Sequence, residues 1–354
     1  MSKYLAKRLA ALEAYVPGEQ PQDKKYVKLN TNESPFPPSP FATRLARQAA
    51  AGLNLYCDPE CRTLTEVAAD AFGVKAEQLI FTNGSDEVLD FAFLAFCDET
   101  APAVFPDITY GFYPVFAAKD GVPFREIPLD ENLRVRVEDY LGVKGTIFLA
   151  NPNAPTGVAL GRAEIERIVA ANPHNVVVVD EAYVDFGGES ALPLIEKYDN
   201  LLVTRTFSKS CSLAGGRLGI GFASPALIAD LKRVKYSTNP YNVNAMTAAA
   251  GVGALLDKEY FESNVATIRE NRAYLTEALT ALGFDVLPSS ANFVFAKCSD
   301  ISGEMLYKKL KEKGVLVRYF DKARIREYVR ITVGTAAELE ALLAAIRAIK
   351  EGQC

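Results

Sequence analysis

Histidine is almost absent from this chain of 354 residues, which contains only one, His174. It lies in Asn172-Pro173-His174-Asn175, a turn ahead of an apolar stretch, and we interpret it as a surface turn residue. A Ser-His-Asp or Cys-His mechanism built on a second histidine is therefore excluded. Cys57 and Cys61 are four residues apart, but no histidine is near them in the sequence, which argues against a zinc site.

Long apolar runs and an excess of basic residues are also missing. No stretch approaches the ~20 apolar residues that span a bilayer, and the first residues have no apolar signal core. The net charge is −5, and no basic patch indicates nucleic-acid binding. We expect a cytoplasmic protein that acts on small molecules, without a membrane or nucleic-acid partner. Scattered cysteines are typical of free thiols in a reducing compartment: Cys57, Cys61, Cys97, Cys211, Cys298 and Cys354.

Two nucleotide-binding motifs are absent. Three glycines occur between Gly216 and Gly221, but they lack the G-x-G-x-x-G spacing and do not follow the first strand. No P-loop is present. A nicotinamide enzyme is therefore a weak alternative.

The chain does contain a regular alternation of strand and helix patterns after residue 41. The strand patterns are nearly continuous apolar runs, which are typical of parallel strands covered on both faces. They predict an α/β fold whose large domain holds a mostly parallel seven-stranded sheet with helices around it. The expected strands are 78–81, 103–105, 124–127, 146–149, 176–179, 201–204 and 219–222.

Three regions follow from the pattern. A proline-rich segment, 1–41, reads as an extended N-terminal arm that joins the small domain. Residues 42–245 form the large domain, and 246–354 a smaller α+β domain with strands at 292–295, 315–318 and 328–333. Ser224 before Pro225 predicts a helix start, and Thr335 with Glu338 predicts a capping box.

Lys209 and Asp180 are the most informative residues. Asp180 ends a run of four valines, where a lone carboxylate is costly unless it is paired. Lys209 lies 29 residues further on, with Thr206, Ser208 and Arg217 around it. A Schiff-base lysine, an acid for a pyridinium nitrogen, and hydroxyls with an arginine for a phosphate are the parts of a pyridoxal phosphate site.

Three further segments follow expected strands, where ligands bind in open α/β sheets. Gly84-Ser85-Asp86 leads into a helix whose N-terminus favours a phosphate. Tyr110 is suited to stacking on an aromatic ring, and Tyr183 to donating to the cofactor's phenolic oxygen. An asparagine in segment 150–157 is suited to the same oxygen, although the segment also reads as a proline turn.

In their order along nearly the whole chain, these motifs resemble the fold-type-I pyridoxal phosphate aminotransferases of the aspartate aminotransferase superfamily. The resemblance extends to the histidinol-phosphate aminotransferase family. The segments that carry it are Tyr15-Val16-Pro17-Gly18, Leu29-Asn30-Thr31-Asn32-Glu33, Asp180-Glu181-Ala182-Tyr183 and Val329-Arg330-Ile331-Thr332-Val333-Gly334.

The resemblance implies a role for each of these residues. Lys209 binds the cofactor, Asp180 pairs with its ring nitrogen, Tyr183 with its ring oxygen, and Tyr110 stacks on the ring. The cofactor's phosphate is held by a larger set: Gly84, Ser85, Asp86, Thr206, Ser208, Arg217 and, from the neighbouring subunit, Tyr56. The last assignment implies an obligate homodimer with a shared active site. Where the family has asparagine before Pro-Thr-Gly this chain has Ala154, and Asn153 is the replacement we predict.

The resemblance also implies a substrate. Arg330, helped by Arg318, is similar to the family arginines that grip an anionic group, and Tyr15 and Asn32 to residues that close over the substrate. The expected reaction is transamination of L-histidinol phosphate with 2-oxoglutarate in histidine biosynthesis. The alternatives are an aromatic amino-acid aminotransferase, a threonine-phosphate decarboxylase of the same fold, or a pyridoxal-binding regulator, for whose DNA-binding domain the chain has no room.

Overall fold

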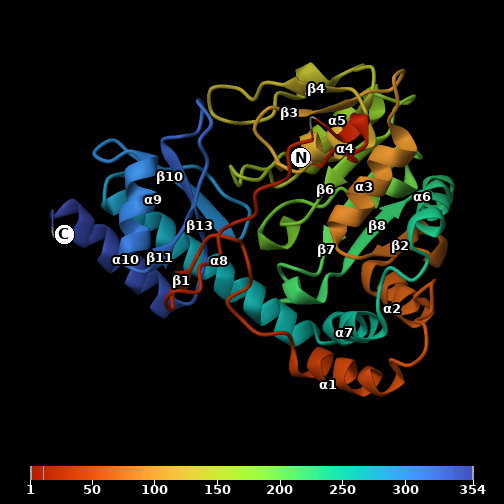
Figure 1. Ribbon diagram of the computed structural model, residues 1–354, viewed down its shortest axis with the longest axis horizontal. Coiled ribbons are helices and arrows are strands. Elements are labelled where there is room, and N and C mark those ends of the chain that lie inside the picture. The colour runs from red at the N-terminus through yellow and green to blue at the C-terminus, as the bar shows by residue number, and fades with distance from the viewer. Residues whose placement is uncertain (1, 11, 353–354) are drawn as a thin grey trace.

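The computed structural model describes residues 2–10 and 12–352. They form a larger unit around a seven-stranded sheet and a smaller unit around a four-stranded sheet, side by side (Figure 1). Five of the six cysteines are described, and all five are free thiols, whereas Cys354 lies outside the described residues. Within the described part of the chain, no helix combines the length and apolar character needed to cross a bilayer.

The large sheet has the predicted, mostly parallel arrangement. Its strand order is β2-β8-β7-β6-β5-β3-β4. Only β8 runs against its neighbours, β2 and β7. The predicted fold class is therefore confirmed. The strands are β2 (Leu79–Thr82), β3 (Ala103–Pro106), β4 (Phe124–Ile127), β5 (Thr146–Ala150), β6 (Val177–Asp180), β7 (Leu201–Thr206) and β8 (Gly219–Ala223).

Both faces of this sheet are buried, which explains the near-continuous apolar strands. Along β6, Val177 and Val179 belong to one hydrophobic core and Val178 to another on the opposite face. The first core is completed by α2 (Arg62–Phe72), α5 (Arg162–Ala171) and α7 (Ala245–Leu256). The second is completed by α3 (Ser85–Phe96), α4 (Tyr113–Asp120) and α6 (Pro225–Thr238).

The small unit is an antiparallel sheet with helices packed against it. Its strand order is β12-β13-β10-β9, and one hydrophobic core joins the sheet to its helices. The strands are β9 (Phe284–Val286), β10 (Phe293–Cys298), β12 (Arg318–Tyr319) and β13 (Tyr328–Thr332). The helices are α8 (Lys258–Ala281), α9 (Gly303–Glu312) and α10 (Ala336–Lys350).

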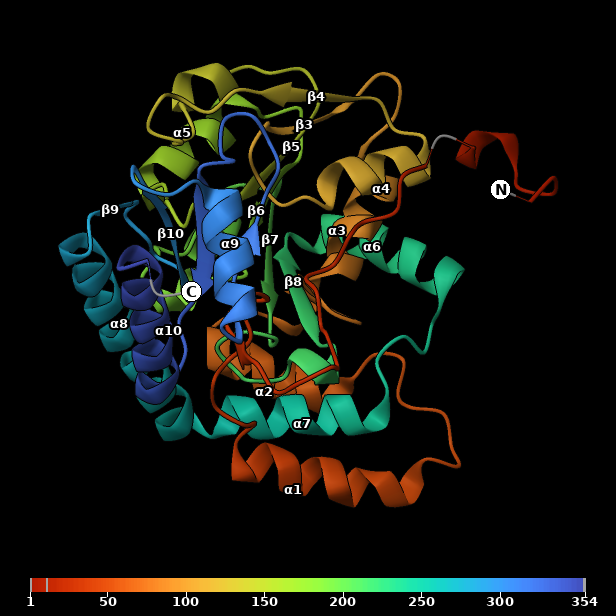
Figure 2. The same cartoon turned by 60° about the vertical axis from the view of Figure 1, so that its left-hand side comes forward.

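The N-terminal arm is tied to the small unit by a short strand pair. In it, β1 (Val27–Lys28) pairs in parallel with β11 (Val315–Leu316). After the arm, α1 (Pro40–Ala49) lies along α7 at the edge of the large unit (Figure 2). Helix α7 packs against both α1 and α2. The boundary at residue 246 stays a prediction.

Helix boundaries follow local chemistry, with one exception. Thr335 and Glu338 form the predicted capping box at the start of α10. Pro225 opens α6 as expected. The hydroxyl of Ser224, however, does not cap α6. It donates to the carbonyl of Asp199 instead, because the end of a neighbouring loop lies within its reach.

Candidate functional site

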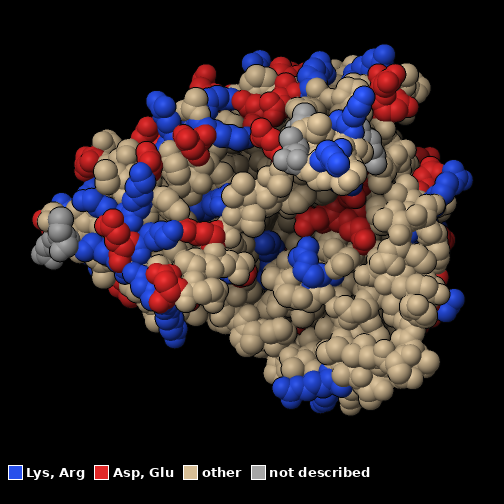
Figure 3. All heavy atoms as spheres, in the orientation of Figure 1, with Lys and Arg blue, Asp and Glu red and all other residues tan. Residues whose placement is uncertain are grey.

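Two adjoining cavities lie between the units. The small cavity, about 200 Å³, is lined by residues of the large unit and the arm, including Asp180 and Arg217. The large cavity, about 460 Å³, reaches the small unit at Arg318 and Arg330. Figure 3 shows the hollow between the two units on this face. The residues common to both cavities are Thr31, Tyr110, Ala154, Tyr183 and Lys209.

The sheet explains why the polar residues meet at the small cavity. Strands β5, β6 and β7 are parallel neighbours, and Asp180 lies opposite Ala150 on one side and Thr204 on the other. Their carboxyl ends therefore open at one edge, which is the usual ligand site of such sheets. The segment after β7 supplies Thr206, Ser208 and Lys209 to the same edge.

Asp180 is a buried carboxylate without a cation. Its side chain is 5% exposed, and Oδ1 accepts hydrogen bonds from Thr204 Oγ1 (3.1 Å) and the Ala182 backbone N–H (3.2 Å). The described residues give it no ion pair. Burial raises the pKa of Asp180 to about 7, although the Thr204 hydroxyl opposes that shift. A cationic group in the small cavity would hold this carboxylate ionised.

Lys209 and Tyr183 face each other across the two cavities. Lys209 Nζ lies 5.9 Å from the centre of the Tyr183 ring and donates one long hydrogen bond, 3.4 Å, to the Thr31 carbonyl. The Tyr183 hydroxyl accepts from Asn32 Nδ2 at 3.0 Å, so its own proton stays available for a ligand. An amine and a phenol with unused donors therefore face the same space.

The N-terminus of α3 has no side-chain cap and lies beside Arg217. The N-cap of this helix is Gly84, with φ of 82°. Arg217 lies against Gly84, since a Cβ there would be 2.4 Å from Arg217 Nη2. Arg217 also contacts Ser208 Oγ (3.5 Å). Free helix N–H groups beside a guanidinium and hydroxyls are suited to a phosphate.

The close packing beneath that helix end depends on Gly219. A Cβ at Gly219 would lie 2.2 Å from the Ser85 backbone nitrogen. Arg217 itself has a left-handed φ of 55°, which is uncommon for a non-glycine residue. This strained turn aims its guanidinium at the helix N-terminus.

Tyr110 and Asp86 both line the small cavity, and Tyr110 also lines the large cavity. The Tyr110 hydroxyl donates to Asp86 Oδ1 at 2.7 Å, and Arg217 Nη2 lies 3.2 Å from Asp86 Oδ2. Asp86 therefore fixes both Tyr110 and Arg217 through its side chain. The Tyr110 ring lines both cavities, as a stacking residue must.

The structure does not bring Asn153 to either cavity. Its Nδ2 donates to the Ile108 carbonyl (3.0 Å) and Thr156 Oγ1 (3.1 Å), and its Oδ1 accepts from Thr109 Oγ1 (2.8 Å). These hydrogen bonds occupy the Asn153 amide and tie it to the segment after β3 and to Thr156 of its own loop. Ala154, with no polar atom on its side chain, lines the cavities in its place.

Arg330 has a donor left without a partner. Its guanidinium packs between the rings of Phe293 and Phe320, at 5.2 and 5.5 Å from their centres. One nitrogen, Nη2, donates to the Asn30 carbonyl (3.2 Å), whereas Nε is buried with no partner among the described residues. Because Arg330 lines the large cavity, its guanidinium is suited to binding an anion there.

The other predicted substrate residues also line the large cavity. Arg318 donates from both Nη atoms to the arm carbonyls of Val16 (3.1 Å) and Pro17 (3.2 Å). Tyr15 packs on Phe112, with the ring centres 4.6 Å apart. The arm therefore closes this side of the large cavity.

Tyr56 lies outside both cavities. Its side chain is 85% exposed and stacks on Tyr241, with ring centres 4.6 Å apart. It belongs to an exposed apolar loop with Leu53 and Leu55, which are 53% and 72% exposed. A single chain therefore leaves Tyr56 without the role predicted for it.

Two residues with polar side chains in the small cavity were not predicted, Thr31 and Glu33. Glu33 accepts from Lys28 Nζ (2.5 Å) and Thr31 Oγ1 (2.7 Å). Those bonds, against the effect of burial, keep the pKa of Glu33 below its usual value. Thr31 and Glu33 lie on either side of Asn32 in the sequence. That position could have predicted them, because residues that flank a site residue in an extended arm lie along the same cleft.

Comparison with known proteins agrees with this geometry. A model of the family "Aminotransferase class I and II" matches residues 24–346. The chain therefore belongs to the class I and II aminotransferases, which are enzymes that use pyridoxal 5'-phosphate. The family predicted from the motifs is confirmed.

Within that class the chain falls among the histidinol-phosphate aminotransferases. Histidinol-phosphate aminotransferase 1 of Bordetella parapertussis is 48% identical over 354 residues, 99% of each chain. Histidinol-phosphate aminotransferase of Pseudomonas syringae pv. syringae is 46% identical over 344 residues, 97% of this chain and 98% of the relative. The Sinorhizobium meliloti histidinol-phosphate aminotransferase structure, in complex with pyridoxal-5'-phosphate, has a TM-score of 0.88 at 24% identity over 99% of both chains, which shows the shared fold.

The raised pKa of Asp180 predicts a pH-dependent stability. Because the folded chain binds this proton more tightly than the unfolded chain, stability falls as the pH rises from the ordinary pKa of 3.8 to about 7. We expect the unfolding free energy of cofactor-free Asp180→Asn, minus that of wild type, to grow by roughly 2–4 kcal/mol between about pH 4.5 and 7.5.

Urea unfolding of the two cofactor-free proteins across this pH range measures the difference. Thr204→Val removes the hydroxyl that opposes the shift, so its stability should continue to fall to a higher pH than that of wild type. Parallel pH profiles for wild type and Asp180→Asn would show that Asp180 is ionised throughout.

Proposed function

We propose that this chain transfers the amino group of L-histidinol phosphate to 2-oxoglutarate, with pyridoxal 5'-phosphate in the small cavity. The observation that carries the proposal is the convergence of Asp180, Tyr183 and Lys209 beside the uncapped N-terminus of α3. The names of relatives 46–48% identical over nearly the whole chain support the amino donor.

The residues of the small cavity fit each part of the cofactor. The phosphate would be held by Ser85 and Asp86 backbone N–H groups with Thr206, Ser208 and Arg217. The buried carboxylate of Asp180, which lacks a cation, would pair with the ring nitrogen. Tyr110 would cover the ring, and Lys209 Nζ would bond to its aldehyde carbon.

The chemistry divides between the cofactor and the chain. When bound, the cofactor supplies an aldehyde that takes up amino groups and a ring that accepts electrons. Asp180 keeps the ring nitrogen protonated, Lys209 Nζ moves the proton at the substrate carbon, and Tyr183 donates to the ring oxygen. Because Ala154 has no polar side-chain atom, the Tyr183 hydroxyl, held by Asn32, would serve that oxygen without an asparagine.

The large cavity is suited to an aromatic substrate that carries an anion. Arg330 would bind the phosphate of histidinol phosphate or the carboxylate of the oxo acid through its guanidinium, with Arg318 lining the same cavity. The rings of Tyr15, Tyr110 and Phe320 line the same space and would pack on an imidazole. The same rings favour an aromatic amino-acid aminotransferase as the second candidate.

We further infer a cytoplasmic homodimer with shared active sites. The exposed loop of Leu53, Leu55 and Tyr56 is apolar, and Tyr56 has no contact with the cavities of its own chain. Burial of this loop against a second copy would stabilise a dimer and would take Tyr56 to the partner's phosphate site.

The first test is a single half-reaction. Purified protein with bound cofactor is mixed separately with L-histidinol phosphate, glutamate, phenylalanine and threonine phosphate, and the cofactor absorbance is followed. Fast bleaching by the first two supports the proposal, preferential bleaching by phenylalanine identifies an aromatic aminotransferase, and release of carbon dioxide from threonine phosphate identifies a decarboxylase. Lys209→Ala should lower the rate by about a thousandfold or more, whereas Lys144→Ala, at an exposed position, should match wild type.

Arg330→Leu should raise KM for both anionic substrates by roughly 10–100-fold, because a charge-assisted hydrogen bond is lost. Arg330→Lys is the matched control, since it keeps the charge and loses the planar fork, and an intermediate KM is expected. Steady-state kinetics with each substrate varied in turn gives both values. Unchanged KM for both substrates would remove Arg330 from the anion site.

The shared site can be tested by mixing two inactive chains. Lys209→Ala and Tyr56→Ala homodimers should each have little activity, but a mixed dimer has one site with both native residues. Co-expression with two affinity tags isolates the mixed dimer, and its activity should exceed that of either parent. A mixed dimer no more active than its parents would place Tyr56 outside the partner's site.

A further inference from the structure

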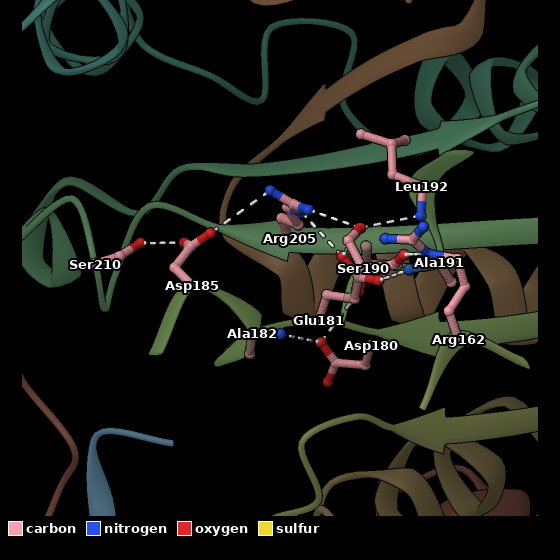
Figure 4. A network of polar contacts seen from close by, with 11 residues as sticks. Arg162, Asp180, Glu181, Ala182, Asp185, Ser190, Ala191, Leu192, Arg205 and Ser210 are labelled. Carbon is pink, nitrogen blue, oxygen red and sulfur yellow. Dashed lines mark hydrogen bonds and ion pairs between the residues drawn. The ribbon is translucent and has the colours of Figure 1, made fainter. Parts of the chain in front are cut away.

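A polar network lies on the far side of β6 and β7 from the small cavity (Figure 4). Its central member is Arg205, on β7 directly after Thr204, which hydrogen-bonds to Asp180. Since side chains alternate along a strand, Thr204 faces the cavity and Arg205 faces away from it.

The Arg205 guanidinium connects two carboxylates. Arg205 Nε lies 3.0 Å from Glu181 Oε2, and Arg205 Nη1 lies 3.6 Å from Asp185 Oδ1. The Glu181 side chain is fully buried, and that of Arg205 is 15% exposed. Glu181 also accepts from Ser190 Oγ (2.7 Å) and the Ala191 backbone N–H (2.5 Å).

The other end of the network reaches the lysine loop. Ser210 Oγ donates to Asp185 Oδ2 at 2.6 Å, and Ser210 is 5% exposed. Ser210 directly follows Lys209, just as Glu181 directly follows Asp180. Asp185 comes two residues after Tyr183. A single guanidinium therefore links the neighbours of the three residues to which the proposed function assigns the cofactor's reacting end.

We propose that Arg205 is a positioning residue, which fixes Lys209 relative to Asp180 and Tyr183 through the chain Glu181–Arg205–Asp185–Ser210. The inference rests on the proposed function, since it concerns how the cofactor's amine and acid are held. None of these four side chains has to touch the cofactor.

The charges explain why a guanidinium stands at the centre. Two carboxylates face it, and burial raises the pKa of Glu181 while Arg205 opposes that rise. A planar fork reaches both partners at once, whereas an ammonium group has no fixed geometry with which to do so. The Arg205 side chain also packs over the Phe72 ring, 5.4 Å from its centre, so its orientation is limited.

A cavity of about 280 Å³ borders the network, which makes matched variants available. It is lined by Arg205, Asp185 and Ser210 and also by Lys258 and Glu262 of α8. Glu262 is exposed and has no part in the network. Glu262→Gln therefore changes a charge at the same cavity without touching the chain from Glu181 to Ser210.

The decisive variant is Ser210→Ala, which removes one hydroxyl and leaves the buried ion pair intact. Arg205→Lys tests the central guanidinium, and Asp185→Asn tests the carboxylate that lies between Arg205 and Ser210. Each protein is studied with cofactor bound, by titrating its absorbance against pH, and by measuring the equilibrium Kd for added pyridoxal 5'-phosphate. The unfolding of the cofactor-free proteins is measured in parallel.

We expect Ser210→Ala to shift the midpoint of the absorbance titration and to raise the cofactor Kd by about tenfold, as loss of an outer partner of a site residue does. Its unfolding midpoint should stay near that of wild type, and Glu262→Gln should match wild type in every measurement. Arg205→Lys should show the larger change in the same direction. A change confined to kcat, with the titration midpoint and Kd unmoved, is not expected.

Two outcomes are distinguished by the wild-type protein. If wild type shows no pH-dependent cofactor absorbance, the proposed function itself is wrong. If wild type titrates and Ser210→Ala has the same midpoint and Kd, the positioning role is overturned. The role is also overturned if Arg205→Lys loses only stability, because a purely structural ion pair would lower the unfolding midpoint and leave the absorbance titration in place.

Discussion

A carboxylate buried at the end of a central strand, with no ion-pair partner among the residues that the structure describes, is the constraint on which this site depends. Asp180 is held there by the parallel pairing of β6 with its neighbours, so it cannot move to solvent without opening the sheet. Burial raises the pKa of Asp180 to about 7, so without a cationic partner the carboxylate is partly protonated at neutral pH. A cationic ring in the small cavity would pair with this carboxylate, and the nearby helix N-terminus and hydroxyls would hold the proposed cofactor there.

Much of the fold and part of the site could be predicted from the sequence, because their signals are local. Four valines ending in Asp180, and hydroxyls around Lys209, are visible within a few residues. Arg205 could not be recognised, since it looks like any strand arginine until β6 lies beside it. The same holds for Asn153, whose amide bonds not only to Thr156 of its own motif but also to Ile108 and Thr109, which are far from it in the sequence.

The small unit contributes two arginines to the site, and the large unit contributes a carboxylate and an amine. Arg318 and Arg330 come from β12 and β13, whereas Asp180 ends β6 and Lys209 follows β7 in the large unit. Aromatic rings on both sides of the guanidinium of Arg330 exclude water from it, so an anion that enters meets a weakly solvated partner. The residues proposed for anion binding and those proposed for chemistry thus come from two different units. These units also meet away from the cavities, for example at the ion pair of Arg324 with Asp107.

The arm joins those frameworks in an asymmetric way. Its strand β1 belongs to the small unit through β11, yet a few residues later Thr31 contacts Lys209 and Asn32 contacts Tyr183. Any rotation of the small unit about α8 must therefore displace the Thr31 carbonyl and the Asn32 amide together with Arg318 and Arg330. The solvent exposure of the Lys209 amine and the positions of Arg318 and Arg330 would therefore change together, because the arm contacts both the small unit and the lysine.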